Sequence, residues 1–355
     1  MHNIIDTTVP VEPATIARSK RRALLPFIPP TTALSYPFLL ALFHVSVTHR
    51  GLGWTAFASF ALLAAIAAPP VAGIYAFWRI GSAVGLSATA IRARGLALTS
   101  VAAAPLYTTL GVVLAIADNP VSDLIVWAVL WVVASAILLW ARRETHTDVQ
   151  VKKPSLHPRV RFAHGVSAAL IVCIFLAMHL SGHVSALWSL RAQHMLMDVF
   201  RHVYRAKLVE PILVGLMFFQ MGTGTVLVWQ YIGREVDLRR TLQIASGAYL
   251  LFYIPGHMNS VFIYARAVQG IPTDWNFATG APTGLLLDAW NIRLLPHYLL
   301  AVFFVVTHLA LGARIVALSH HLSLKISDRL ALAGIAGAAI LAVAIMVGMT
   351  GVHLH

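Results

Sequence analysis

Long runs of apolar residues dominate this chain of 355 residues. The hydrocarbon core of a bilayer is about 30 Å thick, and roughly 20 apolar residues in a helix cross it. Of the residues, 59% are hydrophobic and only 11% are charged, which is far from the balance of a soluble domain. We therefore predict an all-α fold, a polytopic membrane helix bundle with about nine transmembrane helices. The predicted spans are 32–48, 53–80, 95–117, 120–141, 162–188, 209–232, 240–265, 294–318 and 328–350.

Prolines and a single cysteine add further constraints. Pro69 and Pro70 lie together in the second predicted span, where we expect a kink in one helix rather than two spans. Cys173 is the only cysteine, which excludes an iron–sulfur cluster, a cysteine-ligated zinc site and an intrachain disulfide. The first thirty residues have no apolar core, so we expect no cleaved signal peptide.

The basic charge is distributed unevenly between the two sides of the predicted bundle. With nine spans and the N-terminus inside, 19 of the 26 Lys and Arg residues fall in inside segments. This is the positive-inside asymmetry of membrane proteins, and it predicts an N-in, C-out topology. The formal net charge of +13 is thus explained by topology, and we infer no nucleic-acid partner. We expect a multi-pass protein of a bacterial-type inner (cell) membrane, with the lipid bilayer as its surroundings.

A polar stretch between the fourth and fifth spans divides the chain. We predict a cytoplasmic tail over residues 1–31, a four-helix membrane unit over 32–150 and a five-helix membrane unit over 151–355. Within the second unit, residues 189–211 alternate apolar and basic residues, which is typical of an interfacial amphipathic helix. Residues 267–293 are punctuated by Gly, Pro and Trp, and we expect them to cover the outer mouth of the bundle.

Three histidines lie within the long apolar stretches of the second unit: His179, His257 and His308. An imidazole in hydrocarbon is costly, so an intramembrane histidine is a candidate functional residue. A neutral imidazole is also the usual axial ligand of haem iron. The alternative is that these histidines form hydrogen bonds between neighbouring helices.

Depth in the membrane separates the three histidines. At 1.5 Å per helical residue, His179 lies about 27 Å from the inner basic residue Arg161, and His257 lies roughly 25 Å from Arg240. These two histidines should therefore lie at one level, as two axial ligands of one haem must. His308 is only about 9 Å from Arg314, so it belongs to an inner level.

The inner level lacks an obvious second ligand. The sixth span has Val228 at the matching depth, and its nearest polar residue of ligand type is Gln220, more than two turns away. His164, near the inner surface on the fifth span, is the only substitute. The sequence therefore predicts one haem b with His179 and His257, and leaves a second haem with His308 and His164 in question.

Four segments of the second unit resemble a known family. They are 165-GVSAALIVCIFLAMH-179, the pair 210-EP-211, 242-LQIASGAYLLFYIPGHM-258 and 295-LPHYLLAVFFVVTHLALG-312. Residues 160–350 resemble the single-chain, five-helix, two-haem membrane-anchor cytochrome b of succinate dehydrogenase and fumarate reductase. The family's histidine on its second anchor helix is missing here, and the first 150 residues have no counterpart in that family.

The resemblance implies roles for several residues. It implies that His179 and His257 ligate the outer haem and that His308 is one ligand of the inner haem. A Ser/Arg pair lines the family's quinone pocket, which implies a quinone site at Arg161 and Ser167; an ordinary positive-inside anchor is the alternative reading. Position along the helices, rather than the resemblance, makes His183 and His297 candidates for contacts to haem propionates or to the ligands, and His297 also an alternative ligand.

These observations predict an integral membrane b-type cytochrome that transfers electrons between a quinone pool and a partner redox subunit. The alternative is a haemless membrane transporter, or a sensory or anchor subunit that retains the scaffold. No nucleotide-binding glycine loop, nucleophile elbow or paired intramembrane carboxylates argue for catalysis by side chains alone.

Overall fold

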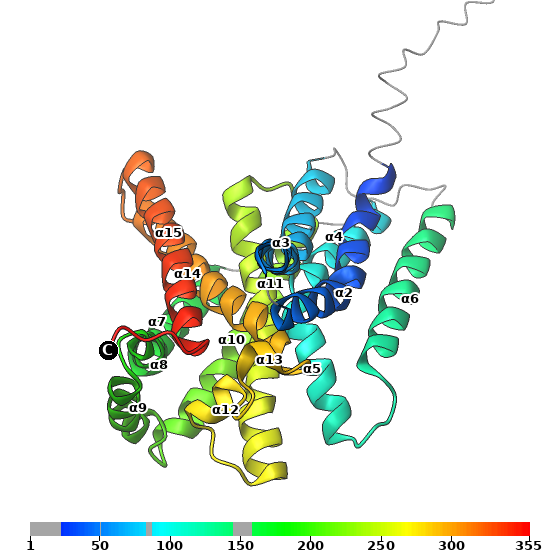
Figure 1. Cartoon of the computed structure of the whole chain (residues 1–355). Helices are drawn as coiled ribbons and strands as arrows, with labels where there is room; N and C mark the ends of the chain where they lie inside the picture. Colours follow the sequence, from blue (N-terminus) through cyan, green and yellow to red (C-terminus); the bar gives the residue numbers. More distant parts are fainter. Residues whose placement is uncertain (1–22, 50, 83–86, 145–157) are drawn as a thin grey trace, which may run out of the picture.

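The computed structural model describes residues 23–49, 51–82, 87–144 and 158–355. Most of the predicted tail and of the polar stretch between the two units lies outside these residues. The described part of the chain is helical and contains no strand (Figure 1). The elements of its first half are η1 (Leu25–Phe27), α2 (Ile28–Thr48), α3 (Leu52–Gly81), α4 (Ala88–Val101), α5 (Ala103–Ile116) and α6 (Asp123–Glu144).

The second half continues the helical order with shorter elements between its long helices. These elements are α7 (Pro158–Ile171), η2 (Val172–Leu176), α8 (Ala177–Val184), η3 (Ser185–Leu187), α9 (Leu190–Tyr204), α10 (Val209–Ile232), α11 (Leu238–Met258), η4 (Asn259–Gln269), α12 (Trp275–Thr279), α13 (Gly284–Leu287), η5 (Asn291–Arg293), α14 (Leu294–Ser319) and α15 (Leu324–Met349). The elements η2 and η4 are π-helical.

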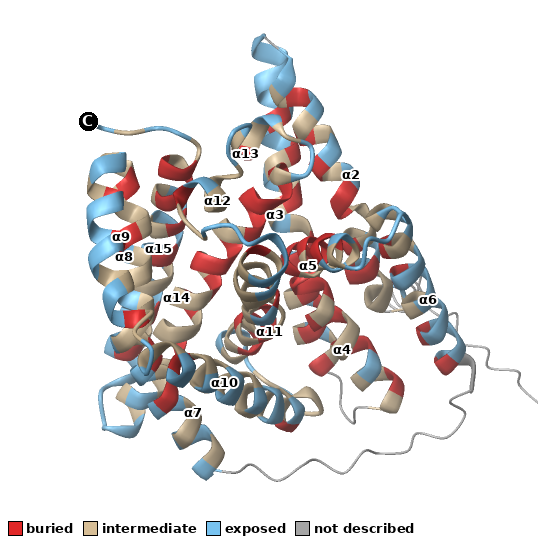
Figure 2. Ribbon diagram, turned by 90° about the horizontal axis from the view of Figure 1, so that it is seen from below, coloured by how far each residue is buried: buried red, intermediate tan, exposed pale blue. Residues whose placement is uncertain are grey.

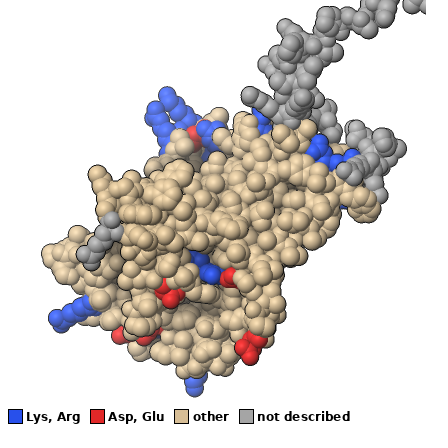
Figure 3. Space-filling model, turned by 45° about the vertical axis from the view of Figure 1, so that its right-hand side comes forward, with Lys and Arg blue, Asp and Glu red and all other residues tan. Residues whose placement is uncertain are grey.

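Seven of the described helical segments are long and apolar enough to cross a membrane, or eight if the pair α4–α5 counts as one span. On the face drawn in Figure 3, a broad surface without Lys, Arg, Asp or Glu separates two zones that carry charges. A multi-pass membrane bundle is therefore supported, but the predicted count of nine is not reached. The segment missing from the count is the predicted span 240–265, which forms α11 and part of η4.

The helix α11 lies at the centre of the bundle, and this position explains its lower apolarity. It packs against α3, α4, α5, α10 and α14, so it can carry polar residues such as Gln243, Ser246 and Tyr249 without exposing them to lipid. Ser246 and Tyr249 are completely buried. Figure 2 shows buried residues gathered where α3, α5, α11 and α14 meet.

Proline has different effects in two of the predicted spans. The helix α3 is one continuous helix from Leu52 to Gly81 with both Pro69 and Pro70 inside it, which confirms one helix rather than two. By contrast, the predicted span 95–117 is broken by a 72° bend between α4 and α5. Pro105 lies in the first turn of α5, where its ring clashes with the carbonyl four residues earlier and disfavours continuation of α4.

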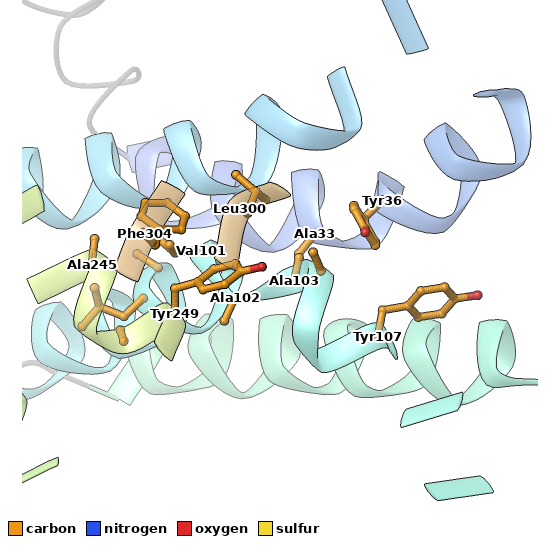
Figure 4. Packing of buried hydrophobic residues seen from close by; sticks show 14 of the residues in the cluster. Ala33, Tyr36, Val101, Ala102, Ala103, Tyr107, Ala245, Tyr249, Leu300 and Phe304 are labelled. Carbon is orange, nitrogen blue, oxygen red and sulfur yellow. The ribbon is translucent and has the colours of Figure 1, made fainter. Parts of the chain in front are cut away.

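The two predicted membrane units share their hydrophobic cores. In one core, Tyr36, Phe77 and Trp127 of the first unit cluster with Tyr249 and Phe304 of the second. Figure 4 shows Tyr249, Leu300 and Phe304 lying against Val101, Ala102 and Ala103. A second core joins α2 and α3 to α12, α14 and α15. The boundary near residue 150 therefore separates the two units in the sequence, but residues of both units pack into the same hydrophobic cores.

Buried arginines also connect the two units. Arg94 of α4 is completely buried and donates to the carbonyl oxygens of Ile232, at 2.5 Å, and Arg234, at 2.7 Å. Ile232 is the last residue of α10, and a cation at its carbonyl is favoured by the helix dipole. Arg293, just before α14, forms an ion pair of 2.6 Å with Asp123 at the start of α6.

We expect Asp123→Ala to lower the free energy of unfolding by about 3 kcal/mol, because it leaves the Arg293 guanidinium without its carboxylate while only 8% of that side chain is exposed. Thermal unfolding in detergent measures the change. Asp198→Ala is the matched control: its 3.9 Å pair with Arg201 is on the surface, with Asp198 70% exposed, and its loss should cost no more than about 0.5 kcal/mol. Equal losses of stability in the two variants would contradict the assignment of Asp123 to a buried ion pair that connects the two units.

Candidate functional site

A cavity of about 670 Å³ lies between α7–α8, α10, α11 and α14. Its walls are mainly apolar, and we refer to it as the central cavity. Five histidines line it: His164, His179, His183, His257 and His308. Three of its five lining arginines, Arg201, Arg205 and Arg266, come from the α9 and η4 side, whereas Arg161 and Arg240 come from the starts of α7 and α11. Following the predicted topology, we call the first end outer and the second end inner.

His179 of α8 and His257 of α11 face each other in the outer half of the central cavity. Their ring centroids are 6.3 Å apart, with 66° between the ring planes. The structure thus brings together the two residues that the depth estimate placed at one level. We refer to them as the outer pair.

Aromatic stacking positions both rings of the outer pair. Phe175 stacks on His179 with centroids 4.8 Å apart, and Tyr253 stacks on His257 at 5.4 Å. Each aromatic residue precedes its histidine by four residues, so one helical turn brings the two rings together. Neither histidine ring has a hydrogen bond to another described residue, and the Nδ1 of His179 is buried without a partner. An aromatic residue four positions before each histidine is therefore the sequence signal for this stacking.

His164 of α7 and His308 of α14 form a second pair, which we call the inner pair. Their ring centroids are 6.2 Å apart, with 81° between the planes. The sequence predicted a partner for His308 on the sixth span, near Val228. The structure instead supplies His164 from the fifth span, the residue named as the only substitute.

Hydrogen bonds favour protonation of Nδ1 in both inner imidazoles. His308 Nδ1 lies 3.1 Å from the carbonyl oxygen of Gln243, which can only accept, so Nδ1 carries the proton. His164 Nδ1 lies 2.8 Å from Thr223 Oγ1, whose own hydrogen is donated to the Phe219 carbonyl. His164 Nδ1 is therefore the donor to Thr223. In a neutral imidazole, protonation of Nδ1 leaves Nε2 unprotonated and able to bind a metal.

Three glycines near the histidines serve different contacts. A Cβ on Gly247 would lie 2.9 Å from Cε1 of His308, so this glycine makes room for the inner ring. Gly182 instead admits Met197 of α9, and Gly256 admits Thr109 of α5. Gly182 and Gly256, which adjoin the outer histidines along the chain, therefore both serve helix packing.

The remaining predicted residues divide between the cavity and its surroundings. His183 lines the cavity, 4.7 Å from His179 between ring centroids. His297 is 97% buried but is not among the lining residues; it packs against Tyr253 at 4.7 Å. Arg161 lines the inner end, whereas Ser167 donates to Gln220 Oε1 at 2.9 Å and does not line the cavity. The structure therefore does not bring Arg161 and Ser167 together as one lining pair.

The amphipathic segment predicted after residue 189 forms α9 at the outer end of the cavity. Arg201 and Arg205 both donate to Thr273, which follows η4. Burial lowers the pKa of Arg205 and raises the pKa of the Tyr204 hydroxyl, against the opposing effect of the nearby arginines on Tyr204. Arg266 is paired with Glu210 at 2.8 Å. The outer end thus places partly desolvated positive charges beside the cavity.

Among the described residues, no cluster of three or more His, Cys, Asp or Glu side chains could hold a metal ion. Each pair therefore offers two ligands. Comparison with known proteins finds no protein-family model, no curated protein and no solved structure that matches this chain.

We expect Gly247→Ala to destabilise the protein by about 2 kcal/mol, because the new methyl group would displace a His308 ring that is held by hydrogen bonds. Gly215→Ala on α10 is the control, since its Cβ meets nothing within 4 Å and alanine is the better helix former by roughly 0.5–1 kcal/mol. Thermal unfolding of both variants in detergent measures the difference. A neutral Gly247→Ala would show that the inner ring is not tightly positioned.

Proposed function

We propose that this chain is a b-type cytochrome of a membrane, with one haem b between His179 and His257 and a second between His164 and His308. The observation that carries the proposal is the equal separation of the two pairs, 6.3 and 6.2 Å between ring centroids. An imidazole nitrogen binds a metal at about 2 Å, and the ring centre lies about 1 Å beyond it, so two rings on opposite sides of one metal are roughly 6 Å apart. Two independent pairs in one cavity meet this requirement.

The chemistry of the donors also fits haem. A porphyrin supplies four ligands of its own, so two histidines complete the coordination of its iron, whereas a bare metal ion needs a larger protein ligand set. The inner pair presents unprotonated Nε2 atoms, which is the form that binds iron. The apolar walls of the cavity suit the macrocycle, and Arg161 and Arg240 at the inner end, and Arg201 and Arg205 at the outer end, suit its propionates.

The positions of the pairs on their helices separate the two sites in depth. His164 and His179 are fifteen residues apart on a continuous helical segment, or about 22 Å along its axis. Haem supplies one-electron transfer when bound. The chain would contribute the ligands and hold the two sites at different depths of one bundle.

We propose that such a protein connects a quinone pool with a partner redox subunit in a bacterial-type cell membrane. The asymmetry of Lys and Arg supports the orientation, and the lining position of Arg161 supports access at the inner end. The proposed Ser/Arg quinone pair has no support from Ser167, which is bonded to Gln220 instead.

The purified protein should show a b-type α-band in its reduced-minus-oxidised spectrum and contain two haems per chain by extraction and quantitation. The reason is that in both pairs the two rings are separated by the distance at which they could together hold one haem iron. A preparation without the band would overturn the proposal in favour of a haemless transporter, sensor or anchor. One haem per chain would restrict the proposed function to a single histidine pair.

Substitution of the ligands should remove the haems one at a time. We expect His257→Ala and His308→Ala each to leave one haem per chain, since they lie in different pairs. His297→Gln is the matched control, because this histidine is equally intramembrane but does not line the cavity, and it should retain two haems. Loss of haem in the control, or retention of both haems in either ligand variant, would contradict the assignment.

A further inference from the structure

The two histidine pairs are held by different kinds of interaction. In the inner pair, both imidazoles donate Nδ1–H to an oxygen of a neighbouring helix, Thr223 Oγ1 for His164 and the Gln243 carbonyl for His308. In the outer pair, both imidazoles are stacked on aromatic rings, and neither has a hydrogen bond to another described residue. The two sites are therefore geometrically alike but chemically different.

A hydrogen bond from Nδ1–H makes an imidazole a more electron-rich ligand. Such a ligand stabilises the more positively charged, oxidised metal and lowers the reduction potential. Ser246 strengthens this arrangement for His308: its Oγ lies 3.1 Å from His308 Nδ1, and its hydrogen is donated to the same Gln243 carbonyl at 3.0 Å. The inner pair thus has the stronger donors.

The charged groups around the outer pair act in the opposite direction. Several titratable or charged side chains from the surrounding elements line the outer half of the cavity: His183, Arg201, Tyr204, Arg205, Glu210, Tyr253, Arg266, Asp274 and Tyr298. Glu210 is engaged by Arg266, and Asp274 caps α12 through Phe277 N. Arg201 and Arg205 are partly buried, so their charge is weakly screened. At the inner end Arg161 is exposed, and the partly buried Arg240 donates to Gln243 Oε1 at 2.6 Å.

We propose that the hydrogen bonds to His164 and His308 make the inner site the lower-potential site, so that electrons run downhill from the inner to the outer end of the cavity. This inference rests on the proposed haem function. It assigns Thr223 as a positioning residue for His164 that also sets the potential. It further implies that the reductant delivers electrons at the inner end, beside Arg161 and Arg240, and that the acceptor is reached at the outer end, beneath α9.

The test is a potentiometric titration of the α-band in the full-length, haem-loaded protein. The wild type should resolve two potentials, and His257→Ala should retain the lower one. Thr223→Val should raise the lower potential and leave the higher one unchanged, because the valine cannot accept from His164. Thr223→Ser should restore the wild-type value. Thr225→Val is the matched control: it lies two residues further along α10 and likewise donates to the carbonyl four residues earlier, that of Met221, but it contacts neither pair.

Ser246→Ala provides a second variant that does not depend on α10. It should raise the same lower potential by a smaller amount, since the Gln243 carbonyl remains available to His308. Two haems whose potentials do not move in Thr223→Val or Ser246→Ala, or a shift confined to the higher potential, would overturn this inference alone. Absence of haem from the wild type would overturn the proposed function together with it.

Discussion

Burial of polar side chains in an apolar bundle is the constraint on which the rest of this structure depends. A polar group removed from water must find a partner or face a cavity, because the cost of leaving it unsatisfied is several kcal/mol in hydrocarbon. The helix α11 collects such groups at the centre of the fold, with Gln243 and Ser246 facing the inner pair and His257 in the outer pair. The long apolar helices around it then form the boundary with lipid.

The first unit holds α11 in place from the side away from the cavity. Thr109 of α5 occupies the space left by Gly256, next to the outer-pair residue His257. Tyr249, one turn before Tyr253, is buried in the core shared with the first unit and donates to the His297 carbonyl at 2.9 Å. The packing of the first unit therefore reaches the outer pair through the same helix, which gives these helices a structural part in the site.

The sequence was informative where a property depended on local pattern. Apolar runs located the long helices, and depth along the helices paired His179 with His257. The bend between α4 and α5 has a local cause at Pro105, whereas the central position of α11 depends on the neighbouring helices. The inner pair was harder to predict because rise along a helix ignores side-chain reach: His164 and His308 differ by about 4.5 Å in estimated depth, which two imidazole side chains can span. The hydrogen bond from His308 to the Gln243 carbonyl involves the backbone, which every residue has, so the sequence does not predict it.

The sixth span explains how an inner pair can form without a histidine on that helix. The resemblance to the anchor cytochromes leads one to expect a ligand there, whereas α10 supplies Thr223. Its hydroxyl is fixed as a donor to Phe219, so its oxygen is left to accept from His164 and to turn that ring toward His308. Gly224, the next residue, lies close to the same ring, and a Cβ there would meet His164 Cε1 at 3.5 Å in ordinary van der Waals contact. In this arrangement α10 orients His164 of α7 and α11 orients His308 of α14, so the inner pair depends on four helices.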